Sequence, residues 1–277
     1  MTQGFTSPQN NLKTLTGTTA PTLTPSFIGQ EYININTGSV YKAIGTSGSY
    51  NWAFIGKGAL AAFNKDSISG LVGWHDFSDV SLMTLSGTNI LSIADKSDSA
   101  IALTRETTHI STYTENVQNG LSACLCGTSS LYGATTVSYG TTFTRAVVIQ
   151  PTGWGTGGYQ VIVGHNSIGV VGKYAGNTNL HLYNGASATV TALTNTALYI
   201  IVAVFNGASS FCYVNGTKYT IATPGTSTLS RLNIGADYGV GEYFIGYLME
   251  TLTFSSVLNE TECGVLNTYL NNKWAIY

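Results

Sequence analysis

Charged residues are scarce in this chain. Eleven Lys and Arg and 13 Asp and Glu make up only 9% of 277 residues, against roughly 25% in soluble globular proteins. So few cations, spread along the whole chain, leave no basic surface to displace counterions from nucleic-acid phosphates. Disorder requires low hydrophobicity and high net charge, whereas here 43% of residues are hydrophobic and the net charge is −2. The composition excludes nucleic-acid binding and intrinsic disorder.

Long apolar runs are also missing. The longest, residues 197–205, is about half of what a membrane-spanning helix needs. The first eight residues (Met-Thr-Gln-Gly-Phe-Thr-Ser-Pro) show neither the basic nor the apolar region of a secretion signal. We therefore expect no membrane insertion and folding in a cytoplasm.

The four cysteines do not form a disulfide pattern. Cys124 and Cys126 are one residue apart, so on a strand they share a face and cannot readily bridge each other. Cys212 lies in a strand pattern and Cys263 in a helical one. We expect reduced, mostly buried thiols. A metal site at Cys124 and Cys126 would need two further ligands, for which His109 is the only candidate.

Turn-forming residues, with 32 glycines among them, are abundant. From residue 71 to 254 they separate short strand patterns, the clearest of which are 144–150, 160–164, 179–183, 199–205, 210–214 and 243–254. Strands at this spacing predict a β-sandwich. Asn215-Gly216 between two such strands predicts a type I′ hairpin, which needs positive φ at both residues.

The chain ends in a predicted helix. Asn259 can cap its N-terminus with Glu262 three residues later, and Leu258 and Cys263 stand at the hydrophobic staple positions. An apolar stripe at helical spacing follows at Val265, Leu266, Tyr269, Leu270 and Trp274. We expect this helix to dock over a sheet edge.

The N-terminal part has a different organisation. Residues 1–25 are rich in Pro and Thr and predict an extended arm. Residues 26–57 predict a small three-stranded meander, with strands at 30–35, 39–44 and 51–55, which is marginal alone and is expected to lean on another chain or domain. Residues 58–70 form a predicted linker to the main domain, residues 71–277.

Several stretches of the main domain resemble a known family. Ser69-Gly-Leu-Val-Gly-Trp-His-Asp-Phe-Ser-Asp79 and Ile93-Ala-Asp-Lys-Ser97 are similar to the opening strands of concanavalin A-like (laminin G-like) jelly rolls. Tyr213-Val-Asn-Gly216 is similar to their central hairpin, and Leu232–Gly235, Tyr243–Glu250 and Tyr269–Trp274 to their closing strands and final helix. The resemblance implies an all-β jelly-roll sandwich preceded by the small β module and extended arm.

The resemblance also implies a setting. Such jelly rolls are common in bacteriophage structural proteins, and Pro25–Trp52 is similar to short β modules of phage fibre and capsid-decoration proteins. The implied protein is displayed on the virion surface, as a capsid decoration or head fibre or as a tail fibre. Its implied partners are other virion proteins, through the arm and β module, and further copies of itself, as in a trimer.

Catalytic motifs are missing: the sequence has no Gly-x-Ser-x-Gly, His-Glu-x-x-His, P-loop or Glu-x-Asp-x-Glu pattern. Glu242 and Glu250 are the most plausible catalytic pair of acids, but they would lie about 26 Å apart on one strand, too far for glycoside hydrolysis. His75, His109, His165 and His181 each stand alone among strand residues and are interpreted as structural. We expect no enzymatic activity.

Calcium is the one cofactor with candidate ligands. The laminin G-like fold often binds calcium through loop carboxylates, and Asp76, Asp79, Asp95 and Asp98 cluster in two predicted loops. The alternative is that Asp79 and Asp95 cap turns through Asx hydrogen bonds.

Two glycine-rich loops carry aromatic residues, at 153–159 and 236–241. A Trp flanked by glycines can present a flat face on which a sugar ring stacks, and a nearby acid or amide can bind its hydroxyls. The candidate glycan-binding residues are Trp154, Tyr159, Asp237 and Tyr238, with Asn177 and Asn179 as helpers. The alternative is that Trp154 folds back onto the sandwich or packs against a neighbouring subunit.

These observations predict a virion structural protein that adsorbs to host or environmental glycans. One alternative is a glycan-degrading depolymerase of a phage tail. Another is a bacterial surface adhesin, which the absence of a visible secretion signal disfavours.

Overall fold

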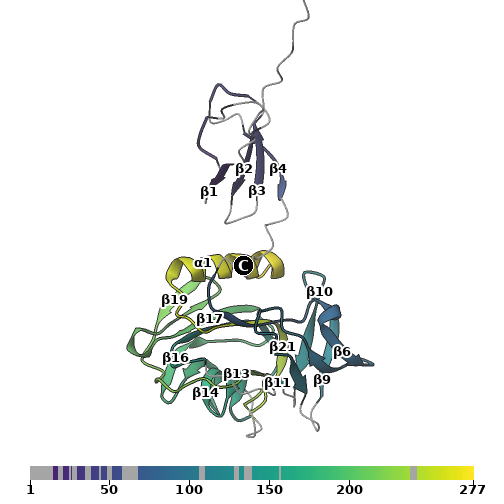
Figure 1. The fold of residues 1–277 in the computed structure, drawn as a ribbon, viewed down its shortest axis with the longest axis vertical. Coiled ribbons are helices and arrows are strands. Elements are labelled where there is room, and N and C mark those ends of the chain that lie inside the picture. The colour runs from purple at the N-terminus through teal and green to yellow at the C-terminus, as the bar shows by residue number, and fades with distance from the viewer. Residues whose placement is uncertain are drawn as a thin grey trace, which may run out of the picture. The chain divides into compact units, whose positions relative to one another are not determined.

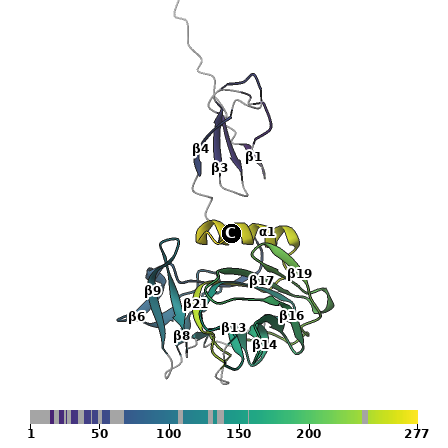
Figure 2. The same cartoon turned by 180° about the vertical axis from the view of Figure 1, so that it is seen from behind.

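The computed structural model describes residues 15–17, 21–24, 26, 30–34, 39–43, 45–48, 52–57, 68–105, 110–127, 131–133, 139–155, 157–237 and 242–277. The chain divides into two compact units, Met1–Ala62 and Phe63–Tyr277 (Figures 1 and 2). Both are built from strands, and the described residues contain a single α-helix. The predicted all-β class is confirmed.

The first unit is a four-stranded sheet made of β1 (Leu15–Gly17), β2 (Glu31–Asn34), β3 (Ser39–Ala43) and β4 (Trp52–Lys57). Strands β2, β3 and β4 form the predicted antiparallel meander. Strand β1 pairs in parallel with β2, opposite Tyr32, so residues 15–17 are a strand and not the extended arm we expected. The free edge of β2 presents unpaired backbone groups, which an extended segment of the same chain can satisfy. The rest of the predicted arm, apart from residues 21–24, lies outside the described residues.

The second unit is a sandwich of two layers. The first layer contains, in spatial order, β19 (Thr217–Thr220), β18 (Phe211–Val214), β17 (Tyr199–Phe205), β12 (Phe143–Pro151) and β21 (Gly246–Phe254), followed by β5 (Leu71–Asp76) and β10 (Leu121–Cys126), which pair with different halves of β21. Asn215 and Gly216, between β18 and β19, have φ of 47° and 74°, as the predicted type I′ hairpin requires.

The second layer contains, in spatial order, β16 (Ser187–Ala192), β15 (Asn179–Tyr183), β14 (Ile168–Lys173), β13 (Gln160–His165), β20 (Asn233–Ile234), β11 (Leu131–Gly133), β8 (Leu103–Arg105), β7 (Asn89–Ile93) and β6 (Met83–Ser86). Strand β9 (Ser111–Gln118) pairs with β10 of the first layer and β7 of the second, and so joins the two layers. Two 3₁₀ turns, η2 (Val80–Leu82) and η3 (Gly207–Ser209), lie between strands. All pairings between these named strands are antiparallel.

The buried apolar residues form two clusters, and β12 contributes side chains to both. Phe143 and Val147 point between the two layers and belong to the main core, whereas Ala146 and Val148 point to the outer side of the first layer. Side chains alternate along a strand, and here the outer set is as buried as the inner one. A strand that is apolar on both faces needs a cover on its outer side.

The cover is α1 (Glu260–Trp274), which crosses the outer face of the first layer (Figure 1). Its predicted capping box is present: Asn259 Oδ1 accepts from the Glu262 backbone N–H at 3.0 Å, and Glu262 accepts from the Asn259 backbone N–H at 2.8 Å. Leu266, Leu270 and Trp274 are buried as expected. Val265, however, is 47% exposed, so the prediction that it belongs to the buried apolar stripe was wrong. The buried face is instead completed by Cys263 and Asn267.

A buried charged cluster fastens α1 to the sheet. The carboxylate of Glu250, on β21, accepts hydrogen bonds from Trp74 Nε1 at 2.7 Å, Trp274 Nε1 at 2.8 Å, Tyr269 Oη at 2.6 Å and Lys273 Nζ at 2.9 Å. Glu250 has no exposed surface. A carboxylate so buried is stable only when hydrogen bonds and an opposite charge replace water, and here four donors do so.

Lys273 continues this cluster to β5. It also donates to Asp76 at 2.7 Å, and Lys96 donates to the same carboxylate at 2.9 Å. Burial alone would raise the pKa of Asp76, but the charge of Lys273 and the hydrogen bonds from Lys273, Ser78 and Lys96 outweigh it and lower that pKa.

All four cysteines are buried and unbridged, as predicted. His109 lies outside the described residues. No helix in the described part of the chain has both the length and the apolar character needed to cross a membrane.

Candidate functional site

Among the described residues, no helix covers the outer face of the second layer, and the side chains of its strands alternate between the core and that face. On β15, Leu180 and Leu182 point into the core and are fully buried. His181 and Tyr183 alternate with these leucines along the strand, so they point to the outer side, where they line a pocket. On β14, Val171 is in the core while Val170 lines the same pocket. Period-2 alternation thus gives this sheet an aromatic and polar outer face.

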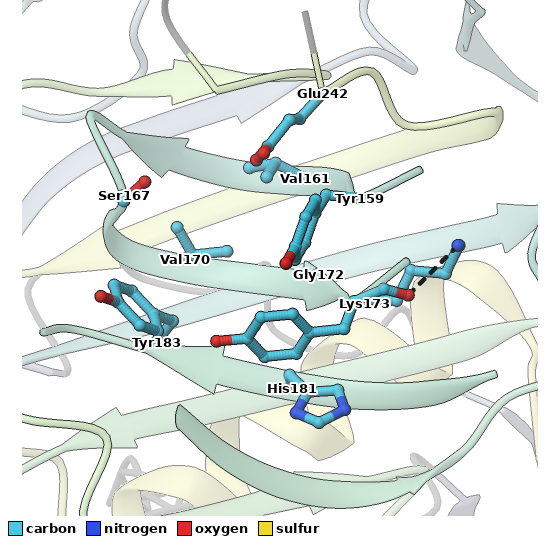
Figure 3. A pocket seen from close by; sticks show the side chains of 10 residues that line it. Tyr159, Val161, Ser167, Val170, Gly172, Lys173, His181, Tyr183 and Glu242 are labelled. Carbon is cyan, nitrogen blue, oxygen red and sulfur yellow. Dashed lines mark hydrogen bonds between the residues drawn. The ribbon is translucent and has the colours of Figure 1, made fainter. Parts of the chain in front are cut away.

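The pocket is a hollow of about 380 Å³ on the outer face of β13, β14 and β15. Its lining residues are Tyr159, Val161, Ser167, Val170, Gly172, Lys173, Tyr174, His181, Tyr183 and Glu242. Figure 3 shows Glu242 above β13 at one end of the hollow and His181 on β15 at the other, with Tyr159 between them.

Gly172 forms part of the floor for a steric reason. A Cβ built there would lie 2.2 Å from the carbonyl oxygen of Gln160 on the neighbouring strand. Only glycine lets the two backbones approach so closely, and the missing side chain leaves the hollow open above it.

Three aromatic rings follow one another along the hollow. The centroids of Tyr159 and Tyr174 lie 5.0 Å apart at an interplanar angle of 66°, and those of Tyr174 and His181 lie 4.6 Å apart at 87°. These edge-to-face contacts are favourable for aromatic pairs. They hold the rings in fixed relative orientations, while Tyr159 remains 44% exposed.

The surroundings change the pKa values of two titratable groups at opposite ends of the hollow, Glu242 and His181. Burial and the charge of Asp237 raise the pKa of the Glu242 carboxyl. Among the described residues, none donates a hydrogen bond to that carboxylate. Burial lowers the pKa of His181, so its imidazole is neutral at pH 7. His181 Nδ1 lies 3.2 Å from Ser187 Oγ, and its buried Nε2 has no hydrogen-bond partner.

Lys173 serves the site as a support and not as an exposed cation. Its Nζ donates to the carbonyl oxygen of Gly158 at 2.8 Å. Figure 3 shows the Lys173 side chain extending sideways from the hollow, with a dashed line for its 3.4 Å hydrogen bond to Tyr174 O. The contact with Gly158 fixes the loop that carries Tyr159. Gln160 adds a second support, because its Nε2 donates to Gly153 O at 2.8 Å and its Oε1 accepts from the Ile245 backbone N–H at 3.2 Å.

Of the four predicted glycan-binding residues, Tyr159 lies in the hollow. Asp237 is buried, and its Oδ2 accepts from the backbone N–H of Ser167 at 2.7 Å. The prediction that Asp237 binds sugar hydroxyls directly is therefore wrong. The tight turn at Asn166 and Ser167, both with positive φ, leaves an N–H that needs an acceptor, and Asp237 supplies it. Tyr238 lies outside the described residues.

The predicted exposure of Trp154 is also wrong. Its side chain is 2% exposed, its Nε1 donates to Thr178 O at 2.7 Å, and its ring packs edge-to-face on Phe244. Asn195 binds the backbone of Trp154 from both sides, accepting from its N–H and donating to its carbonyl oxygen at 3.0 Å. The flanking glycines let the chain fold back so that the indole fills the sandwich, which was the alternative interpretation.

The predicted helpers do not reach the hollow either. Asn177 Oδ1 accepts from the backbone N–H of Asn179 at 3.0 Å and so starts β15. Neither asparagine is among the residues that line the hollow.

The calcium candidates are occupied by protein groups. Asp79 caps η2 by accepting from Ser81, and Asp95 accepts backbone N–H groups of Trp74, Ser97 and Ile101, so the Asx interpretation is confirmed for these two. Asp76 is bound by Lys273 and Lys96. Asp98 does not join the other three in a metal-binding group, because no three His, Cys, Asp or Glu side chains come together within the described ranges.

Glu242 and Glu250 do not form a catalytic pair. Glu250 lies beneath α1 on the first layer, whereas Glu242 lines the hollow on the outside of the second. Strand β21 begins at Gly246, so the two acids do not share one strand as we expected.

Four residues of the hollow were not predicted as binding residues: Tyr174, His181, Tyr183 and Glu242. His181 and Tyr183 could have been found from the segment Asn179-Leu-His-Leu-Tyr183. Leucines alternate there with aromatic residues, which predicts a strand with an aromatic outer face. No comparable signal marks Glu242, because the partners that form the hollow around it lie up to 83 residues earlier, at Tyr159.

No protein-family model matches the chain, and no curated protein matches it in sequence. Among solved structures, it is similar to domain 4 of AbnA, a GH43 extracellular arabinanase from Geobacillus stearothermophilus, in complex with arabinotriose. The TM-score is 0.53 and the identity 12%, over 72% of this chain and 98% of that domain.

Two further similarities cover smaller parts of longer chains. The binding domain of Paraclostridial Mosquitocidal Protein 1 matches with a TM-score of 0.50 and 15% identity, over 72% of this chain and 52% of that one. A Trypanosoma rangeli sialidase matches with a TM-score of 0.51 and 14% identity, over 85% of this chain and 37% of that one. At these identities the comparisons establish the β-sandwich jelly-roll fold.

Proposed function

We propose that this protein binds glycans in the hollow on the outer face of β13, β14 and β15. The observation that carries the proposal is the run of rings Tyr159–Tyr174–His181 beside the Glu242 carboxylate. Aromatic rings offer apolar faces to the C–H groups of a sugar, and a few fixed polar groups orient its hydroxyls, as is usual in ligand pockets.

The charges of the hollow favour a neutral saccharide. Glu242 is an anion that can accept a hydrogen bond from a sugar hydroxyl. Of the described lining residues, Lys173 is the only cation, and its ammonium group is bound to Gly158 O. A uronic or sialic acid would bring a carboxylate close to Glu242 without an opposing free cation, which is unfavourable.

The arrangement supports binding more than hydrolysis. Glycoside hydrolysis generally needs two carboxyl groups on either side of the scissile bond. Glu242 is the single acid among the described residues that line the hollow, and the nearby Asp237 is buried and bound to Ser167. The similarity to an arabinanase domain solved with arabinotriose supports a saccharide ligand.

The virion setting is a further part of the proposal. In it, the jelly roll is displayed on a phage particle, as a capsid decoration, head fibre or tail fibre, after folding in the host cytoplasm. The division at Ala62 supports a separate role for the first unit, which would attach to other virion proteins or to further copies of the chain, as in a trimer. Immunolabelling of particles tests this setting independently of glycan binding.

Glycan binding is tested by retention on immobilised saccharides. We expect the protein to bind neutral oligosaccharides such as arabinotriose better than sialyllactose, and Tyr159→Ala to lower the affinity at least about tenfold, since a factor of ten corresponds to about 1.4 kcal/mol. Tyr277→Ala, which removes another exposed tyrosine, is the matched control and should bind normally. Equal retention of Tyr159→Ala and Tyr277→Ala would refute the site. Sustained release of reducing ends would refute the non-enzymatic role.

A further inference from the structure

A buried arginine stands in the interior of the sandwich. Arg145 lies on β12 between Phe143 and Val147, and its side chain points the same way as theirs, between the layers. It is only 2% exposed. Burial lowers the pKa of its guanidinium to about 10, so the group remains a cation at pH 7.

This cation has no protein partner among the described residues. Its Nε and Nη2 atoms are buried without a hydrogen bond, and no ion pair to it is formed there. By contrast, the buried carboxylate of Glu250 receives four donors. Buried polar groups in native proteins are nearly always hydrogen-bonded, and those that are not point to an ordered water or ion.

The guanidinium lines a small internal cavity. The cavity has a volume of about 10 Å³, comparable to the space needed for the centre of one water-sized particle. Asn233 lines it too, is 1% exposed, and has neither amide atom hydrogen-bonded. The other polar residues of the lining are His75, Thr251 and Thr253. The Nε2 atom of His75 lies 3.1 Å from Ile101 O. Burial lowers the pKa of His75, so it adds no charge at pH 7.

No acid forms an ion pair with Arg145 within the described ranges. Asp237 is the acid whose charge acts on Arg145, but its Oδ2 is bound to Ser167 and the two residues form no ion pair. Arg145 and Arg231 both act on His165 as positive charges, and Asp237 as a negative one. Asp95 also acts as a negative charge on His75 and Tyr139. The guanidinium of Arg145 still has no ion pair among the described residues, and an unpaired buried charge costs several kcal/mol.

We propose that Arg145 and Asn233 bind a small monovalent anion of the size of chloride in this internal cavity. The Nε–H and Nη2–H groups of Arg145 and the Nδ2–H groups of Asn233 are the donors. The buried hydroxyl of Tyr139, whose pKa burial raises to about 12 despite the charge of Arg145, is a neutral donor near the same cation. An anion there neutralises the guanidinium and connects β12 of the first layer to β20 of the second. The site is independent of the glycan-binding hollow.

The first test is the melting temperature of the full-length protein in sodium chloride and in sodium gluconate at equal ionic strength. Gluconate is too large for the cavity. A ligand that binds only the native state raises Tm with a saturable dependence on its concentration, so we expect a rise of a few degrees in chloride that gluconate does not reproduce. Equal melting curves in the two salts would overturn the proposal.

Arg145→Met assigns the effect to this residue. The variant keeps an apolar side chain of similar length and removes the charge, and its melting curves in chloride and gluconate should coincide. Lys218→Met, which removes a cation paired with Glu260 on the surface, is the control and should keep the chloride effect. A chloride effect that persists in Arg145→Met would contradict the assignment.

Anomalous diffraction tests the proposal without the Arg145→Met variant, and so remains decisive if that variant does not fold. Crystals of the unaltered protein grown in sodium bromide should show an anomalous peak next to the guanidinium of Arg145. An ordered water without anomalous signal at that position would overturn the proposal.

Discussion

The two outer faces of the sandwich have opposite chemistry. On the first layer, Val148 and Val202 are apolar, and α1 covers them. On the second layer, the corresponding face carries tyrosines, His181 and Glu242 around an open hollow. A face that is closed by a helix gains stability from apolar burial, whereas a face left open can meet a ligand. The same strand alternation therefore produces a structural surface on one side and a candidate binding surface on the other.

Two of the buried charged groups, Glu250 and Arg145, show the same contrast. Glu250, under the covered face, has its hydrogen bonds satisfied by residues from β5 and α1. Arg145, between the layers, has none among the described residues. The first arrangement is complete without a ligand, and the second is the one for which we propose an anion.

The largest expected effect is on the covered face. Glu250→Ala leaves two indole N–H groups, a phenol and Lys273 without their buried acceptor, and breaking a buried ion pair in this way typically costs about 3–5 kcal/mol. We expect a large fall in the free energy of unfolding by urea denaturation. Glu260→Ala removes a surface carboxylate paired with Lys218 and should show no measurable change. If the two variants were equally stable, the covered face would not depend on this cluster.

The next effect concerns the loop under the open face. Trp154→Phe keeps an aromatic ring against Phe244 but leaves the carbonyl oxygen of Thr178 without its donor, which costs about 1–3 kcal/mol. We expect a lower stability and a smaller loss of saccharide affinity than for Tyr159→Ala. A variant that loses all binding while its melting temperature is unchanged would show that Trp154 contacts the ligand after all.

A smaller effect is the pH dependence of binding. The pKa of Glu242 is raised above its usual 4.5, so its carboxylate takes up a proton at a higher pH than an ordinary glutamate does. A neutral carboxyl is a weaker acceptor, and the affinity for arabinotriose should fall by up to about tenfold as the pH decreases through that pKa. Calorimetric titrations at several pH values measure this.

Glu242→Gln is the control for the pH effect. It should bind more weakly at pH 7 and lose the part of the pH dependence that belongs to Glu242. Any dependence left would belong to His181, whose pKa is lowered from 6.5 by burial. An unchanged pH profile in Glu242→Gln would remove Glu242 from the site.

The smallest effect is expected from removing the first unit. The division at Ala62 and Phe63 separates two units with their own sheets. A chain starting at Phe63 should therefore melt at the same temperature as the jelly roll in the full chain, and should bind saccharides equally well. Loss of folding on deletion would show that the two units depend on each other. Loss of attachment to particles, with folding intact, is the result expected if the first unit is the anchor.

Local signals in the sequence predicted much of the fold. Asn215-Gly216 specified its hairpin because the turn needs positive φ at both residues. Asn259 and Glu262 specified the start of α1 because they bond to each other's backbone N–H groups. The residues of α1 that face the sheet were less well predicted. Val265 fits the helical spacing of the apolar stripe, but its side chain is largely exposed.

The candidate site was predicted in part. Tyr159 was identified from its glycine-rich loop and does line the hollow. Trp154 has the same local context but turns inward, because Thr178, Asn195 and Phe244 lie where its indole and backbone can bind. A glycine-rich loop permits both directions, so its sequence cannot choose between them.

The sequence by itself determined the class of this protein: few charges, abundant turn residues and strand periodicity lead to an all-β sandwich with a capped final helix. The tertiary structure decided which face α1 covers, which aromatic residues remain exposed, and that Arg145 is buried between the layers. The physical reason is the range of the interactions. Turns and caps form between neighbours in sequence, whereas burial, ring contacts and the balance of charge depend on strands that are far apart along the chain.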